Sequence, residues 1–143
     1  MKIFDYWQTY AFASAFFAGC VAVLAKIGVA NIPSNTATLI RTIVITFFLV
    51  AIVSLRGEWV DPSALDKRSF IFLALSGIAT GFSWLCYFKA LQMGPAAKVA
   101  SVDKLSLVFA VVMAVLFLGE HLSAKGWGGV ILMALGALLV VLK

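Results

Sequence analysis

Charged side chains are scarce in this chain. Only 12% of its 143 residues are Asp, Glu, Lys or Arg, about half the share in an average soluble protein, whereas 64% are hydrophobic. The mean hydropathy is +1.10. So few polar groups cannot cover the surface of a soluble protein of this size, and disordered chains are far more polar. We therefore expect the chain to lie in a lipid bilayer.

Residues that carry chemistry are also few. There is one histidine, His121, and there are two cysteines, Cys20 and Cys86, which lie in apolar stretches and are expected to be reduced packing residues. The sequence has no glycine-rich phosphate loop and no metal-ligand spacing. We therefore expect no enzyme, no metal and no other cofactor. The net charge is +5, but the sequence has no polar basic domain that could bind nucleic acid, so we expect no nucleic acid partner. The basic residues are instead expected near lipid headgroups.

Five apolar segments are long enough to cross a bilayer, which requires about 20 helical residues. They predict an all-α polytopic membrane protein, a bundle of five transmembrane helices in a single membrane domain over residues 1–143. The expected helices cover approximately 10–30, 37–55, 70–93, 97–118 and 124–142. A cleaved signal peptide is the alternative for the first segment, but its apolar run is too long for one.

The punctuation between the segments agrees with these boundaries. The three prolines, Pro33, Pro62 and Pro95, all fall between expected helices. Ser69 and Ser123 are the expected N-caps of the third and fifth helices.

The basic residues specify the membrane orientation poorly. With five spans, the side of the N-terminus has five Lys or Arg and the opposite side has six. The aromatic residues favour a single orientation, because five of them fall on the N-terminal side: Tyr6, Trp7, Tyr10, Trp59 and Trp127. Counting only residues in loops or tails also favours one orientation, with the N-terminus in the cytoplasm.

Charged residues within the expected spans are the first functional candidates, because they are costly in lipid and usually face the protein interior. They gather toward the side opposite the N-terminus: Lys26, Arg41, Lys89, Lys98, Asp103 and Lys104. They are interpreted either as a positive vestibule with Asp103 paired to a cation, or as lysines that extend to the headgroups. The expected partners of Asp103 are Lys26, Arg41 and Lys89, since a neighbour in a helix points elsewhere.

A polar stripe runs along the third segment. Its hydroxyls recur at spacings of four, three and four on one helix face, and glycines and aromatic rings recur on the adjoining face. The residues are Ser76, Thr80, Ser83 and Tyr87, with Gly77, Gly81, Trp84 and Phe88 beside them. Such a face suits the wall of a ligand cavity, and it equally suits close packing between membrane helices.

The stretch from Leu85 to Val141 resembles the second half of an EamA repeat, the five-helix unit of the drug/metabolite transporter superfamily. The specific pieces are Tyr87-Phe88 with Ala90-Leu91, then Gly94-Pro95-Ala96, Asp103-Lys104-Leu105-Ser106 and Leu118-Gly119-Glu120. In the first half, Phe16-Phe17-Ala18-Gly19 stands where the family often has a Trp-Gly pair. The resemblance covers roughly residues 10–142 and is to the short, single-repeat members.

The resemblance implies export or exchange of small metabolites. Larger members of the family carry two repeats in opposite orientations around a central cavity, whereas this chain has one repeat. It also lacks the acidic residue in the first helix on which the small four-helix multidrug exporters rely, so proton-coupled export of hydrophobic cations is not expected.

We therefore expect a secondary transporter, an exporter or exchanger of a small anionic or zwitterionic metabolite, in the bacterial inner membrane. A homodimer, antiparallel rather than parallel, is expected to supply the second repeat. The alternatives are a non-transporting membrane subunit and a lipid-handling protein. The candidate substrate-binding residues are Lys26, Arg41, Ser76, Thr80, Ser83, Trp84, Tyr87, Asp103 and Lys104.

Overall fold

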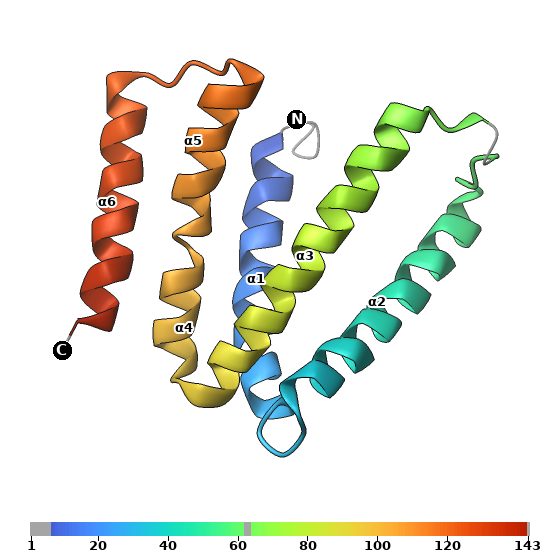
Figure 1. Ribbon diagram of the computed structural model, residues 1–143, viewed down its shortest axis with the longest axis horizontal. Helices are drawn as coiled ribbons and strands as arrows, with labels where there is room; N and C mark the ends of the chain where they lie inside the picture. The colour runs from blue at the N-terminus through green and yellow to red at the C-terminus, as the bar shows by residue number, and fades with distance from the viewer. Residues whose placement is uncertain (1–6, 62–63, 143) are drawn as a thin grey trace. The chain divides into compact units, whose positions relative to one another are not determined.

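The computed structural model describes residues 7–61 and 64–142, and these residues are helical apart from short connections. The helices are α1 (Trp7–Gly28), α2 (Ser34–Arg56), α3 (Lys67–Met93), α4 (Ala96–Asp103), α5 (Ser106–Leu118) and α6 (Ala124–Val141) (Figure 1). Five spans are long and apolar enough to cross a membrane, with α4 and α5 together forming the fourth. The all-α, five-span fold predicted from the sequence is confirmed. Tyr6 of the aromatic set, Pro62 and Lys143 lie outside the described residues.

The fourth span differs from the sequence-based expectation of one continuous helix over 97–118. It is interrupted at Lys104 and Leu105, where the backbone hydrogen bonds shift from i→i+4 to i→i+3. The amide of Leu105 donates to the carbonyl of Val102 over 2.9 Å, and the amide of Leu107 donates to that of Lys104 over 3.1 Å. These are the bonds of a tighter, 3₁₀-like turn. No proline or glycine marks this position, so the sequence carried no ordinary signal for it.

Side-chain caps mark the starts of α3 and α6. Ser123 caps α6 as predicted, since its hydroxyl accepts a hydrogen bond from the amide of Gly126 at 3.2 Å. The prediction for Ser69 is wrong. α3 begins at Lys67, three residues earlier than expected, and the Asp66 carboxylate accepts from the Ser69 amide at 3.1 Å. Asp66 therefore satisfies an amide that has no partner within the helix.

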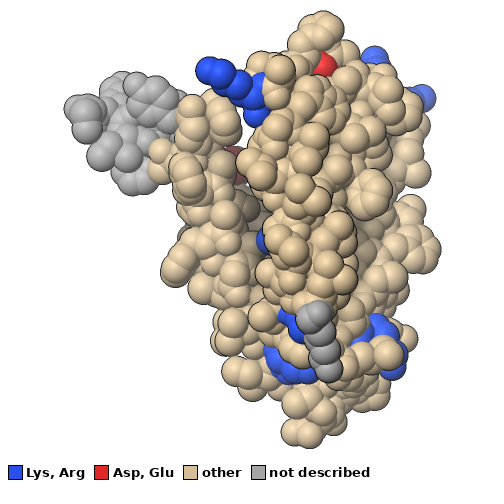
Figure 2. Space-filling model, turned by 90° about the vertical axis from the view of Figure 1, so that its left-hand side faces the viewer, with Lys and Arg blue, Asp and Glu red and all other residues tan. Residues whose placement is uncertain are grey.

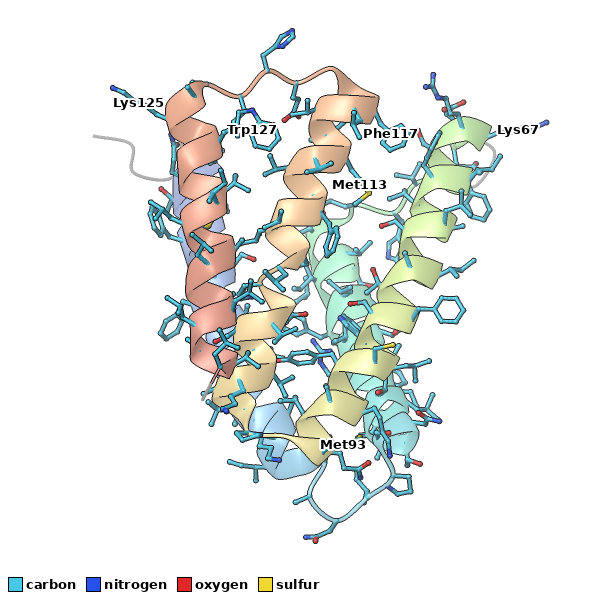
Figure 3. The ribbon with its side chains drawn as sticks, turned by 60° about the vertical axis from the view of Figure 1, so that its left-hand side comes forward. Lys67, Met93, Met113, Phe117, Lys125 and Trp127 are labelled. Atoms are coloured by element: carbon cyan, nitrogen blue, oxygen red, sulfur yellow. The ribbon has the colours of Figure 1, made fainter. Side chains whose placement is uncertain are left out.

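The chain divides into two compact units. One consists of Met1–Lys26 and Met93–Lys143, and the other of Ile27–Gln92. In the first unit, α6 packs along both α4 and α5. The second unit contains α2 and α3, and Lys67 and Met93 mark the two ends of α3 in Figure 3.

Large apolar side chains cover the outside of the helices. Leu55 is 88% exposed and Phe117 is 81% exposed, which water would penalise and lipid does not. On the face that carries α6, uncharged residues fill the middle while Lys and Arg lie toward its ends (Figure 2). Fully buried side chains are small in number, with Leu91 and Val29 the largest. The chain is a multi-pass membrane protein.

Candidate functional site

The centre of the candidate site is an arginine stacked on aromatic rings between α2 and α3. The guanidinium carbon of Arg41 lies 4.0 Å from the centre of the Trp84 ring and 5.4 Å from that of Phe88. Both distances are within the range of a cation–π attraction. Arg41 is half-buried, and Phe88 is only 3% exposed. The rings fix one face of the planar guanidinium, so its N–H groups are presented at the edge.

Among the described residues, no acidic side chain pairs with this arginine. Neither α2 nor α3 contains Asp or Glu, and within residues 7–61 and 64–142 Arg41 makes no ion pair or hydrogen bond. Since intramembrane charges are normally paired, Arg41 is a positive charge held in place without a counter-charge from its own unit.

Of the predicted α3 stripe, Trp84 and Tyr87 are the members that the structure brings to Arg41. Both are half-buried. Ser76, Thr80 and Ser83 are exposed, and the hydroxyl of Thr80 donates to the carbonyl of Ser76 in its own helix at 2.9 Å. The aromatic half of the stripe therefore supplies the stacking surface.

A second set of hydroxyls lies on α2 and was not identified from the sequence. Thr38, Thr42 and Thr46 each donate to the carbonyl four residues earlier, over 2.9, 2.8 and 2.9 Å. The signal was available, because threonines at i, i+4 and i+8 surround Arg41 along one side of the helix. Each hydroxyl already donates a hydrogen bond to a backbone carbonyl, so its oxygen can only accept a hydrogen bond from a ligand.

Gln92 was also missed, and it ties the end of α3 to the loop before α2. Its side-chain amide donates to the carbonyl of Ile32 at 3.0 Å and to that of Val29 at 3.4 Å. Val29 and the neighbouring Leu91 are 1% and 0% exposed. This clamp fixes the start of α2 against the end of α3, and so helps to place Arg41 opposite Trp84.

Two of the lysines in the predicted vestibule bind backbone carbonyls instead. Lys26 donates to the carbonyl of Gly94 at 2.9 Å, just beyond the end of α3, and Lys98 donates to that of Val141 at 3.3 Å, at the end of α6. A cation at a helix C-terminus satisfies an otherwise unpaired carbonyl and complements the helix dipole. Neither of the two interpretations of these lysines from the sequence included a bond to a helix end.

Asp103 has a cationic partner, but it is not one of the expected residues. Its carboxylate lies 3.7 Å from the ammonium group of Lys104, whereas Lys26, Arg41 and Lys89 were predicted. Both side chains are accessible at the end of α4, and they come within this distance although the backbone of Lys104 is still helical, at φ −67° and ψ −14°. The pair is exposed, with 37% of the Asp103 and 54% of the Lys104 side chain accessible.

Two hollows are lined by residues of the first unit. A cavity of about 240 Å³ is lined by Ala110, Val111, Ala114 and Val115 of α5 and by Glu120, His121 and Leu122. A groove of about 620 Å³ follows Ala15, Gly19 and Cys20 on α1 together with Phe16, Val23 and Leu24. The predicted site residues do not line these two hollows.

The model of the EamA-like transporter family matches residues 5–142. An uncharacterized transporter encoded in the cobO 3' region of Sinorhizobium sp. is 54% identical over 134 residues, which are 94% of this chain and 95% of that protein. Protein RarD of Salmonella typhi and that of Salmonella typhimurium are each 27% identical over 109 residues, 75% of this chain and 37% of RarD. No solved structure matches.

Proposed function

This chain belongs to the EamA-like transporter family, and we propose that it carries a small anionic or zwitterionic metabolite across the bacterial inner membrane as a secondary transporter. Its family and the names of its relatives make it a membrane transporter of the drug/metabolite type and point away from an enzyme. The choice of an anion or zwitterion rests on this chain's own residues.

The observation that supports the proposal is Arg41, stacked at 4.0 Å on Trp84 and without an acidic partner in the described residues. A guanidinium presents parallel N–H donors that match the two oxygens of a carboxylate or phosphate. Holding it in one orientation on a ring lowers the entropy that binding costs. A cationic solute would meet an uncompensated like charge there, and is disfavoured.

The other candidate residues have different roles in this proposal. Trp84 and Tyr87 orient Arg41. Ser76, Thr80 and Ser83 lie on the same helix, α3, as these two aromatic residues. Lys26 stabilises the end of α3, which is an architectural role. Asp103 and Lys104 form an exposed pair at the break between α4 and α5, and we assign them to the conformational behaviour of that span.

The working unit in this proposal is a homodimer, with antiparallel subunits. Five spans are few for enclosing a solute path, and the Lys and Arg count of five against six leaves both orientations accessible. RarD, a family relative, extends well beyond the part that this chain matches.

Cysteine labelling tests the antiparallel arrangement of the two subunits. In a variant with Cys20 and Cys86 replaced by Ala, a new cysteine at Glu58 should react from both faces of the membrane. Reaction from one face alone contradicts antiparallel subunits.

Transport is tested in proteoliposomes with labelled succinate, β-alanine and choline as probes. Succinate or β-alanine should enter and choline should not. Arg41→Ala should abolish that uptake. Arg56→Ala is the matched control, because Arg56 lies on the same helix but ends it, and pairs with Glu58 at 3.6 Å. Uptake of choline, or uptake that survives Arg41→Ala, contradicts the proposal.

A further inference from the structure

The hollow at the end of α5 combines apolar walls with one acidic residue. Alanines and valines of α5 line one part of it, and Glu120, His121 and Leu122 of the loop between α5 and α6 line the rest. Its volume is about 240 Å³. Pockets for drug-sized ligands begin at about 300 Å³. The hollow therefore suits one small group with an apolar extension rather than a whole solute.

Two features make this hollow attractive to a cation. Within residues 7–61 and 64–142, the Glu120 carboxylate makes no ion pair or hydrogen bond, and Lys125, the nearest lysine in the sequence, does not pair with it. The second feature is the end of α5 at Leu118, directly before Glu120. The last carbonyls of a helix have no partner within it and form the negative end of its dipole.

The level of the hollow in the bilayer indicates where such a cation comes from. Glu120 follows the end of the fourth span, Ala96–Leu118. Trp127, in the first turn of α6, lies just beneath the loop that joins the two helices (Figure 3). Tryptophan rings gather at the headgroup level of a membrane. A phospholipid at this level brings both a charged headgroup and an apolar chain.

We propose that this hollow binds a phospholipid with a primary ammonium headgroup, such as phosphatidylethanolamine. The ammonium donates to the Glu120 carboxylate, and an acyl chain lies along the alanines and valines of α5. A primary ammonium has N–H donors for this bond, whereas the trimethylated headgroup of phosphatidylcholine has none. The site shares no residue with the Arg41 site, and the inference does not rest on the proposed function.

The test measures which lipid the purified full-length protein retains. The protein is placed in mixed micelles with equal amounts of dioleoyl phosphatidylethanolamine and dioleoyl phosphatidylcholine, and bound lipids are counted by native mass spectrometry. One phosphatidylethanolamine per chain should be retained, with an affinity about tenfold above that of phosphatidylcholine. This ratio corresponds to one hydrogen bond to a charged group, at the lower end of the usual strength. Octylamine, a free amine with an apolar chain, should not displace the lipid.

Glu120→Gln keeps the size of the side chain and removes its charge. It should lower the affinity for phosphatidylethanolamine to that for phosphatidylcholine and leave phosphatidylcholine binding unchanged, which also shows that the variant is folded. Glu58→Gln is the matched control. Glu58 is the other glutamate of the chain, and it is exposed but pairs with Arg56 at 3.6 Å. The preference should survive this change.

A second pair of variants tests the apolar wall. Ala114→Leu places a larger side chain in the hollow and should also remove the preference for phosphatidylethanolamine. Val112→Leu enlarges a side chain on the same helix outside the hollow, and should leave the preference intact.

Four results would overturn the inference. Equal retention of the two lipids by the wild type shows that the ammonium is not recognised. A preference that survives Glu120→Gln or Ala114→Leu places the bound lipid elsewhere. A preference lost in Glu58→Gln as well reflects the surface charge of the whole protein. Displacement by octylamine assigns the hollow to free amines instead of a lipid.

Discussion

The stack of Arg41 on Trp84 predicts an energetic coupling between these two residues. The guanidinium carbon lies 4.0 Å from the Trp84 ring centre, well within the roughly 6 Å range of a cation–π attraction. Such pairs contribute about 0.5–1 kcal/mol when exposed and about 2 kcal/mol when desolvated. Arg41 is half-buried, so we expect a coupling of about 1–2 kcal/mol.

A double-mutant cycle measures this coupling. Arg41→Met keeps the length of the side chain and removes the charge, while Trp84→Leu removes the ring. Unfolding of wild type, both single variants and the double variant is followed by circular dichroism in mixed micelles of rising sodium dodecyl sulfate content. The difference between the double variant and the sum of the singles is the coupling.

Phe88 provides the internal comparison. Its ring centre lies 5.4 Å from the same guanidinium carbon, so the coupling of Arg41 to Phe88→Leu should be the smaller of the two. A coupling to Trp84 below about 0.3 kcal/mol, the scatter expected of independent sites, refutes the reasoning. A larger coupling to Phe88 than to Trp84 refutes it as well.

Three further predictions concern stability in the same assay. Gln92→Met removes the donor to two loop carbonyls and should cost about 1–3 kcal/mol, whereas Gln8→Met, at an exposed position on α1, should cost little; equal costs would contradict the clamp. Asp103→Asn breaks an exposed pair and should change stability by less than about 1 kcal/mol, so a severe loss would show that Asp103 does more than pair with Lys104. Gly119→Ala, at φ +68°, should destabilise by about 1 kcal/mol, while Gly77→Ala, where an added Cβ meets nothing within 4 Å, should not; a neutral result at Gly119 would argue against the left-handed end of α5.

The spans could be predicted because the bilayer imposes length and composition, which are local properties of the sequence. The cap at Ser123 could be predicted for the same reason, since a cap acts within one turn. Asp66 was missed because a shift of three residues in the start of α3 changes which side chain reaches the free amides.

The site was predicted in part. Arg41 and Trp84 were both candidates, because a charge and a large ring within apolar runs are visible in the sequence. That they touch depends on how α2 and α3 pair, which no local pattern states. The clamp by Gln92 and the bonds of Lys26 and Lys98 were missed because their acceptors are backbone carbonyls, which look alike at every position in a sequence.

The break at Lys104 and Leu105 affects how α6, which is uninterrupted, can pack along both α4 and α5. On a straight α-helix, seven residues fall about 20° short of two full turns. Contact residues that recur every seven positions therefore rotate about the helix axis by about 20° per heptad, away from the neighbouring helix. A 3₁₀-like residue advances by about 120° rather than 100°, so two of them restore about 40°. The break thus cancels the drift of about two heptads. α4 and α5 can both keep their faces against the uninterrupted α6, which a coiled coil achieves only by winding its helices around each other.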